Sequence, residues 1–369
     1  MDTVILTTTI NIPHLLLRYA QNVREFGHEH VAFIVIGDRK TPPATADFCA
    51  KLQQQFDLSV TYVDLEAQQR YLARFPGLWE YLPFDSIMRR NIGFLMAYEQ
   101  GADLTITIDD DNFVTNQDFV GHHAVVMQTT TLPVYESSTG WLNVCAFLEE
   151  QHGECFYHRG HPLSQRWRDE IVTREHVAGR VVVNAGLWLD APDIDAFTWL
   201  HRPVVATGLR EASTPRSALA RSTWAPFNSQ NTALARRALP AYFLCPYIGR
   251  YDDIWASYCI RAIADHLGDY VTYGLPLVRQ VRNAHKLWDD IDRERFGAER
   301  GDWFIEALQG CTLRQTTYSG CFEELVASLA DRLQQGLPWP KAEQDRLYRV
   351  VEGMKLWRET FSILTTADS

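Results

Sequence analysis

Short apolar, β-branched runs alternate with helical patterns over the first third of the chain. Such runs are typical of buried strands. They cover residues 3–9, 31–36, 58–63 and 104–108. Strands that alternate with helices predict a mostly parallel sheet flanked by helices, which is an α/β fold. The strand ends carry polar residues, which are Thr8, Asp38, Asp64 and three aspartates after residue 108.

The three consecutive aspartates, Asp109, Asp110 and Asp111, end the fourth run abruptly. Ligands bind at strand tips in open α/β sheets. Adjacent carboxylates repel one another, and a divalent cation that prefers oxygen ligands, such as Mn²⁺ or Mg²⁺, relieves the repulsion. The triplet therefore indicates a metal site that holds a diphosphate. The alternative is an acidic turn, because aspartate is common in turns, and the triplet alone leaves both interpretations open.

An amphipathic helix is expected over residues 85–100, just before the triplet strand. Met88, Ile92 and Leu95 follow helical spacing, and the polar face carries Arg89 and Arg90. These two arginines are either part of a solvated helix face or cations close to the phosphates of a ligand. Neither the glycine-rich dinucleotide fingerprint nor the P-loop motif occurs, so a nucleotide would be held in another way.

The middle of the chain has a weaker pattern, and its histidines have no partners at metal-ligand spacing. We therefore expect surface or loop histidines rather than zinc ligands at His122, His123, His158 and His161. Further on, a strand is expected over 180–189 and a mobile loop over 210–222.

An amide-rich cluster at residues 228–231 is expected to lead into a helix that ends near Leu239. Asp252 and Asp253 begin another helix, where acidic residues also serve as simple caps. The composition shifts beyond about residue 290, and amphipathic stretches at 322–333 and 343–361 predict a helical tail. We expect a main domain over 1–290 and a C-terminal helical extension over 291–369, whose exposed aromatic residues leave a homo-oligomer open.

Composition narrows the class of partner. The chain has 369 residues, 46% hydrophobic and 22% charged, with a net charge of -11. This charge argues against nucleic acid or an anionic membrane as the main partner. The seven scattered cysteines, the lack of a basic leader and the lack of a long apolar run favour a soluble, cytoplasmic protein.

Several separate segments resemble the reversibly glycosylated polypeptides, a family that includes the plant UDP-arabinopyranose mutases. The resemblance runs from about Thr3 to about Pro276. Its most specific pieces are the triplet context, Ile106 to Phe113, and the string Gly249-Arg250-Tyr251-Asp252-Asp253-Ile254-Trp255. Other pieces are Phe84 to Ser86, Arg90, Gly93, Arg159 to Arg166, Gly186 to Leu189, Pro192 and Asp193.

The resemblance implies a GT-A nucleotide-sugar fold, a mixed sheet whose acidic motif binds Mn²⁺ or Mg²⁺ and the diphosphate of a UDP-sugar. Asp109, Asp110 and Asp111 match the metal- and ribose-binding motif, with Asp111 as the direct metal ligand. Asp252 and Asp253 match a second acidic pair, and Arg166 matches the arginine that is reversibly glycosylated. These three are the implied catalytic residues.

Two departures from the family pattern affect the implied ligand set. The family's Cys-Gly-Met-Asn string is Asn228-Ser229-Gln230-Asn231 here, so only Asn231 matches. A family histidine that is similar to a metal ligand corresponds to Gln280, and His285 follows five residues later as a candidate ligand.

The expected function is a metal-dependent glycosyltransferase that takes a nucleotide sugar, expected to be a UDP-sugar, and gives the sugar to an acceptor the sequence does not name. The alternatives are a pyranose/furanose mutase and a non-catalytic nucleotide-sugar-binding subunit. In each case the expected donor-binding residues are Thr8, Asp38, Asp64, Arg89, Arg90, Asp109, Asp110 and Asn231. The expected metal ligands are Asp109, Asp111 and His285.

Overall fold

The computed structural model describes residues 1–211, 213–214, 216–282 and 286–367. One continuous hydrophobic core runs through these residues, from Val4 near the N-terminus to Leu364 near the C-terminus. The expected α/β fold, with a mixed sheet flanked by helices, is confirmed.

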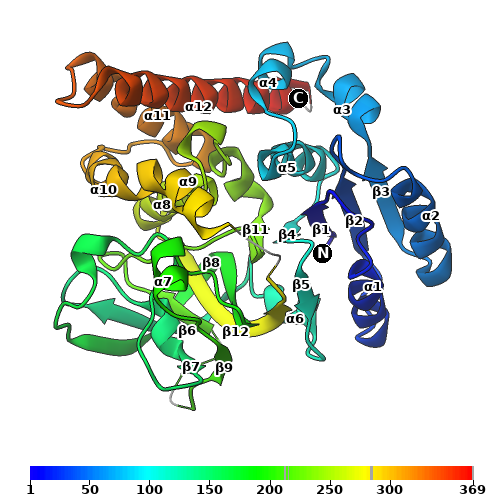
Figure 1. The fold of residues 1–369 in the computed structure, drawn as a ribbon, viewed down its shortest axis with the longest axis horizontal. Coiled ribbons are helices and arrows are strands. Elements are labelled where there is room, and N and C mark those ends of the chain that lie inside the picture. The colour runs from blue at the N-terminus through cyan, green and yellow to red at the C-terminus, as the bar shows by residue number, and fades with distance from the viewer. Residues whose placement is uncertain (212, 215, 283–285, 368–369) are drawn as a thin grey trace.

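The N-terminal part is a parallel sheet in the order β3-β2-β1-β4 (Figure 1). Its strands match the expected ones within one residue: β1 (Thr3–Thr8), β2 (Val31–Ile36), β3 (Ser59–Val63) and β4 (Leu104–Ile108). The helices that connect them are α1 (Leu16–Glu25), α2 (Ala44–Phe56), α3 (Leu65–Leu72), α4 (Pro76–Tyr81), the 3-10 turn η1 (Ile87–Arg89) and α5 (Arg90–Glu99). Right-handed crossovers place α1 and α2 on one face of the sheet and α5 on the other. The four strand ends therefore lie along one edge.

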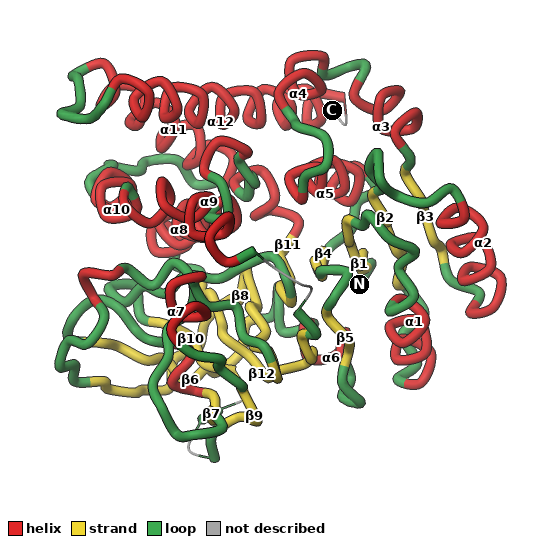
Figure 2. Tube along the Cα trace, in the orientation of Figure 1, coloured by secondary structure: helices red, strands yellow, loops and turns green. Residues whose placement is uncertain are grey.

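The sheet continues through strands that are largely antiparallel, shown together in the lower left of Figure 2. Strand β11 (Asn231–Ala235) lies between β4 and the long β8 (Val172–Asp190) and is antiparallel to both. The remaining strands are β5 (Asn112–Val114), β6 (Thr129–Ser137), β7 (Leu148–Glu150), β9 (Ala206–Leu209), β10 (Arg216–Leu219) and β12 (Tyr270–Gln280). Short helical turns connect them: α6 (Phe119–His123), η2 (Val144–Phe147), η3 (Leu163–Gln165) and α7 (Ala196–His201).

Two expectations for this half are wrong. Part of the stretch expected as a mobile loop forms β10, which pairs with β6 and β12. The helix expected after residue 231 is instead β11, followed by the 3-10 helix η4 (Arg236–Ala241). All five residues of β11 are buried between two neighbouring strands. The run Asn-Thr-Ala-Leu-Ala is short and buried on both sides, so it shows no alternation of apolar and polar positions that would distinguish strand from helix.

The C-terminal part is helical, as expected. After η5 (Pro246–Ile248) and α8 (Asp252–Leu267) come α9 (Leu287–Glu299), α10 (Gly301–Gln309), α11 (Tyr318–Gln334) and α12 (Lys341–Ala367). Helix α12 crosses the top of Figure 1 and packs on α11 and α4. The proposed boundary at residue 290 lies inside α9, and the division into two domains stays a prediction. Within the described residues, every helix is too short or too polar to cross a membrane.

Candidate active site

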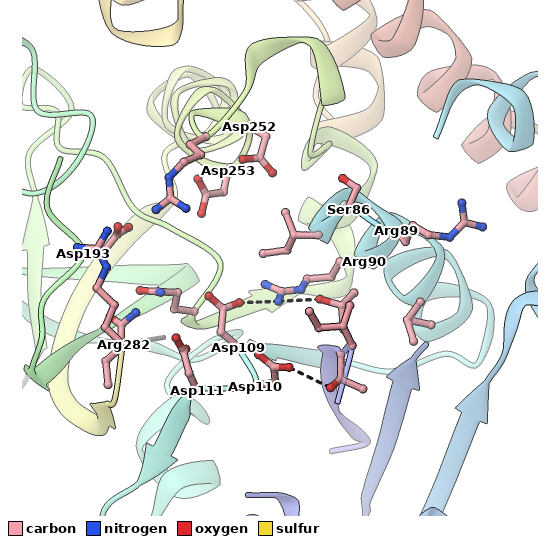
Figure 3. A pocket seen from close by; sticks show the side chains of 18 of the residues that line it. Ser86, Arg89, Arg90, Asp109, Asp110, Asp111, Asp193, Asp252, Asp253 and Arg282 are labelled. Carbon is pink, nitrogen blue, oxygen red and sulfur yellow. Dashed lines mark hydrogen bonds and ion pairs between the residues drawn. The ribbon is translucent and has the colours of Figure 1, made fainter. Parts of the chain in front are cut away.

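A cavity of about 330 Å³ lies at the carboxyl ends of β1, β2 and β4 and faces the N-terminus of α8 (Figure 3). This volume lies in the range of small-molecule sites, about 300–1,000 Å³. The cavity collects segments that are far apart in sequence. Among the expected site residues it is lined by Thr8, Asp38, Arg89, Arg90, Asp109, Asp110, Asp111, Asp252 and Asp253.

The first aspartate of the triplet is held by a buried arginine. Arg90 donates from Nη2 to Asp109 Oδ1 at 2.5 Å and from Nη1 to the Ser229 carbonyl at 2.8 Å. Its guanidinium is completely buried, so the solvated-face interpretation of this arginine is wrong. The geometry makes Arg90 a clamp that fixes the triplet to α5 and to Ser229, two residues before β11.

The second aspartate faces the turn after β1. Thr9 Oγ1 donates to Asp110 Oδ2 at 2.9 Å. Burial raises the pKa of Asp110; the Thr9 hydrogen bond opposes this, and the charge on Asp109 adds to it. The third, Asp111, accepts a hydrogen bond from Asn112 at 2.8 Å and lines the cavity beside them. The three carboxylates thus have three different environments.

The acidic pair lies across the cavity from the triplet, on the first turn of α8 (Figure 3). Gly249, just before it, has φ of +78°, and a Cβ there would lie 2.1 Å from the Arg293 carbonyl oxygen. Only glycine fits this left-handed, crowded turn. The glycine of the Gly-Arg-Tyr-Asp-Asp string is therefore what allows α8 to begin at the cavity.

A buried arginine from a distant loop bridges two carboxylates of the site. Arg159 donates to both oxygens of Asp193, at 2.9 and 2.8 Å, and to both oxygens of Asp253, at 3.1 and 3.3 Å. Burial disfavours the charged guanidinium, but the two carboxylates outweigh it and raise the pKa of Arg159. The pKa of Asp193 shifts in the opposite direction. Burial would raise it, but the charge on Arg159 lowers it below its ordinary range.

Asp252 differs from its neighbour. Its Oδ2 atom is buried without a hydrogen-bond partner. Burial, and then the charge on Asp253, raise the pKa of Asp252 to about 8, against the opposing charge of Arg159.

Two further arginines lie on the wall near α9. Arg250 contacts Asp290 at 3.7 Å and Glu294 at 3.3 Å, and Arg282 contacts Asp290 at 3.3 Å. The Arg282 guanidinium also stacks on Trp199, 4.7 Å from the ring centroid. Both side chains keep some solvent exposure, so they supply positive charge within reach of a bound anion.

Some expected site residues are not brought to the cavity. Asp64 caps α3 by accepting the Ala67 amide at 2.8 Å, and β3 is three strand spacings, about 14 Å, from β4. Asn231 faces the interior, where it contacts His123 at 3.0 Å and donates to the Leu187 carbonyl at 2.9 Å. These two placements correct the expectation of donor-binding roles, because each polar group is already used by the fold.

Arg89 and Arg166 are also used differently from the expectation. Arg89 reaches the wall but points away from the triplet (Figure 3), donating to Gln68 at 2.6 Å and lying over the Phe84 ring. Arg166 is absent from the cavity lining. It pairs with Asp195 at 2.8 Å and stacks on Tyr157. His285 lies outside the described residues.

The expectation of surface or loop histidines holds for the loop positions of His158 and His161, but His123 lies in α6. His123, His158 and His161 are all buried, and burial lowers the pKa of each. Each has aromatic neighbours, such as Trp188 beside His158. They are packed core histidines, and none lines the cavity.

Several lining residues were not expected to be site residues, namely Arg159, Asp193, Gln230, Arg250, Gln280 and Arg282. Three of them, Arg159, Asp193 and Arg250, lie in the strings that carry the family resemblance. The signal that could have identified them was their position within those strings, next to residues already assigned to the site.

The cavity wall offers oxygen donors that suit a divalent cation. Oxygen donors of the triplet lie on its wall together with Gln280, whose Oε1 atom is buried without a hydrogen-bond partner. Among the described residues, however, no three or more carboxylate, imidazole or thiol side chains are grouped to hold a metal. Mg²⁺ is commonly bound by one or two carboxylates together with substrate phosphates. The donors therefore fit a cation that arrives with a phosphate ligand.

A comparison with protein families decides the relationship of this chain. The family model described as reversibly glycosylated polypeptide matches residues 47–365. The chain belongs to this family. The aspartate triplet and the Gly-Arg-Tyr-Asp-Asp string follow one another along the chain in the expected order.

The curated relatives carry the name UDP-arabinopyranose mutase. The chain is 27% identical to UDP-arabinopyranose mutase 3 of Arabidopsis thaliana over 270 residues, covering 71% of this chain and 68% of that protein. It is 31% identical over 238 residues to probable UDP-arabinopyranose mutase 1 of Pisum sativum, covering 62% of this chain and 60% of that protein. The match thus spans less than two thirds of the pea protein.

Solved structures give a more distant similarity. Glucosyl-3-phosphoglycerate synthase from Mycobacterium tuberculosis in complex with Mn²⁺ and UDP-glucose superposes with a TM-score of 0.42 at 12% identity, covering 81% of this chain and 78% of that one. A mannosyltransferase from Pyrobaculum calidifontis in complex with GDP-mannose and Mn²⁺ superposes with a TM-score of 0.31 at 10% identity, covering 100% and 76%.

Proposed function

We propose that this chain binds a UDP-sugar together with Mn²⁺ or Mg²⁺ in the described cavity and breaks the bond between the sugar and the diphosphate. The observation that carries the proposal is one cavity in which the aspartate triplet after β4 faces the acidic pair of α8. A single small-molecule ligand can therefore contact both acidic groups at once.

The triplet side is proposed to hold the diphosphate end. Asp111, Asp109 and Gln280 would hold the cation, with Asp109 already oriented by Arg90. The cation would offset the negative charge that develops on the leaving diphosphate. Arg250 and Arg282 lie on the same wall and would add positive charge beside the phosphates.

The nucleoside end is proposed to lie over the ends of β1 and β2. Thr8 and Asp38 line this part of the cavity, and Asp38 Oδ2 accepts the Ser86 amide at 3.1 Å. That hydrogen bond fixes the carboxylate at the wall. A ribose hydroxyl donates hydrogen bonds, so an oriented carboxylate is a suitable partner for it.

Two outcomes follow from the same bond cleavage. We propose ring interconversion between pyranose and furanose forms, because the curated relatives are named UDP-arabinopyranose mutases. The second candidate is transfer to an external acceptor. It is supported by Trp199, a half-buried ring on the cavity wall against which a saccharide acceptor could pack.

The test is incubation of the purified chain with UDP-arabinopyranose, with and without Mn²⁺, followed by chromatography. Formation of UDP-arabinofuranose without any acceptor supports interconversion. Release of free UDP only after a saccharide acceptor is added supports transfer. Calorimetric binding of the UDP-sugar without turnover under either metal would identify a non-catalytic binding subunit. Absence of UDP-sugar binding would overturn the proposed function.

A further inference from the structure

The two aspartates at the start of α8 are neighbours in sequence but have different contacts. Asp253 is surrounded by donors: Arg159 reaches both of its oxygens, and Ser229 donates its amide at 3.1 Å and its hydroxyl at 3.3 Å. Such a carboxylate is fixed in place by an ion pair and hydrogen bonds. It has little capacity left for a ligand.

Asp252 lines the same cavity with an oxygen that has no partner. It is 5% exposed, and its Oδ2 atom has no hydrogen-bond partner. Leaving a buried polar atom unpaired is costly, so such atoms in native proteins need an explanation. A ligand hydroxyl in the cavity would satisfy this oxygen.

The charges around Asp252 explain why it differs. Arg159 carries one positive charge, which it shares between Asp193 and Asp253, so this group is net negative. The other titratable neighbours are Tyr242 and Cys245, and burial raises the pKa of both. Asp252 is thus buried next to an excess of negative charge. Burial first, and then the charge on Asp253, raise its pKa.

We propose that Asp252 is the catalytic residue that exchanges a proton with a sugar hydroxyl, and that Asp253 is a positioning residue that holds Arg159 and the floor of the cavity. The inference rests on the proposed function and deepens it. Both aspartates line the cavity, but Asp253 is already engaged by Arg159 and Ser229, whereas Oδ2 of Asp252 has no hydrogen-bond partner.

The proposed step balances as follows. The hydroxyl oxygen forms a bond to the anomeric carbon while the bond from that carbon to the diphosphate oxygen breaks, and the bonding electron pair leaves with the diphosphate. The hydroxyl proton moves to Oδ2 of ionised Asp252. In the reverse direction protonated Asp252 returns the proton. A group that works in both directions is most effective when its pKa is close to the working pH.

The experiment compares Asp252→Asn with Asp265→Asn, and measures rate against pH between 5.5 and about 9, a range that spans the titration of Asp252. Asp265 is a matched control because it is a mostly buried aspartate on the same helix, but it contacts Trp224 and Arg261 outside the cavity. Calorimetry with UDP measures ligand binding separately, and thermal unfolding shows that each variant folds.

In the unaltered chain, turnover of UDP-arabinopyranose is expected to rise with pH and level off near 8. Asp252→Asn is expected to lower turnover by about 100-fold or more, the usual contribution of proton transfer, and to abolish the rising limb. UDP affinity should not change. Asp265→Asn should keep both the turnover rate and its rise with pH. Asp253→Asn should instead weaken UDP binding and lower the melting temperature, because Arg159 loses a partner.

The outcomes separate this inference from the proposed function. If the Asp252→Asn variant turns over and its rate still rises with pH as in the unaltered chain, the assignment of Asp252 is overturned and the proposed function stands. The assignment is also overturned if the rise of the rate with pH is lost in Asp253→Asn but kept in Asp252→Asn. If the unaltered chain binds UDP-sugars without turnover, or does not bind them, both are overturned.

Discussion

Arg90 and Asp109 form an ion pair in which Nη2 and Oδ1 are 2.5 Å apart, with the Arg90 side chain only 1% exposed. The pair joins the first turn of α5 to the end of β4, and Arg90 continues to the carbonyl and hydroxyl of Ser229. The three aspartates are therefore not equivalent. Asp109 is neutralised inside the protein by Arg90. Asp111 is the carboxylate that the family resemblance implies as the direct metal ligand.

Replacing Arg90 by leucine should destabilise the fold strongly. The change removes the charge partner of the Asp109 carboxylate and one of the donors to the Ser229 carbonyl, which keeps the Thr107 hydroxyl at 3.0 Å. Breaking a buried pair costs about 3–5 kcal/mol. Urea titration of the purified variant measures the free energy of unfolding. Arg70→Leu is the control, because its pair with Glu66 is exposed and worth about 1 kcal/mol or less. Equal losses of unfolding free energy in Arg90→Leu and Arg70→Leu would contradict the role of Arg90 as a clamp.

Asp111→Asn should remove metal-dependent ligand binding. In the unaltered chain, UDP with Mn²⁺ should raise the melting temperature more than UDP alone, because a ligand that binds only the folded state stabilises it by mass action. The variant should lose the Mn²⁺-dependent part. Asp64→Asn removes the same charge outside the cavity, and asparagine caps helices about as well as aspartate. An unchanged Mn²⁺ effect in Asp111→Asn would refute the cation role.

Arg166 should remain unmodified when the protein is incubated with a UDP-sugar. The guanidinium is 10% exposed, paired with Asp195 and absent from the cavity wall, so the anomeric carbon of a bound donor cannot reach it in this conformation. Intact-mass and peptide mass spectrometry test this. A dicarbonyl reagent should modify the exposed Arg168 before Arg166, as a control for access. A sugar found on Arg166 would contradict the prediction.

The stability of the folded chain should fall with rising pH because of Asp252. Its pKa is about 8 in the folded state, above the ordinary value of 3.8. The folded state therefore binds a proton that the unfolded state has released. The stabilisation from this proton is complete below the unfolded pKa and is lost as the pH rises through the folded value. Urea titrations from pH 4 to about 9 should show this decline, and Asp252→Asn should flatten it.

A decline that is equally steep in Asp252→Asn would assign the effect to other groups. Asp265 is the main competitor, because burial raises its pKa to about 6. Its contribution lies at lower pH, so Asp265→Asn should leave the loss of stability between about pH 7 and 9 unchanged.

Local sequence was sufficient for the parallel half of the fold. The strands at 31–36 and 104–108 have the bounds that their apolar runs predict. Helical segments connect each of these strands to the preceding one. The expected helices at 322–333 and 343–361 lie within α11 and α12. In these segments the period of apolar residues matches the element, so local and tertiary preferences agree. The prediction for residues 231–235 was wrong because this strand is buried on both sides, and burial on both sides removes that period.

The order of residues along the chain is enough to show that carboxylates follow a buried strand and begin a later helix, and that both strings belong to one family pattern. Which polar groups remain for a ligand follows from the packing of the folded chain. It places Arg159 between Asp193 and Asp253, uses Asn231 and Asp64 within the fold, and leaves Asp252 Oδ2 buried without a partner. The reason is physical. Hydrogen bonding and charge pairing depend on distances between residues far apart in the chain, whereas a sequence pattern reports only which groups are available.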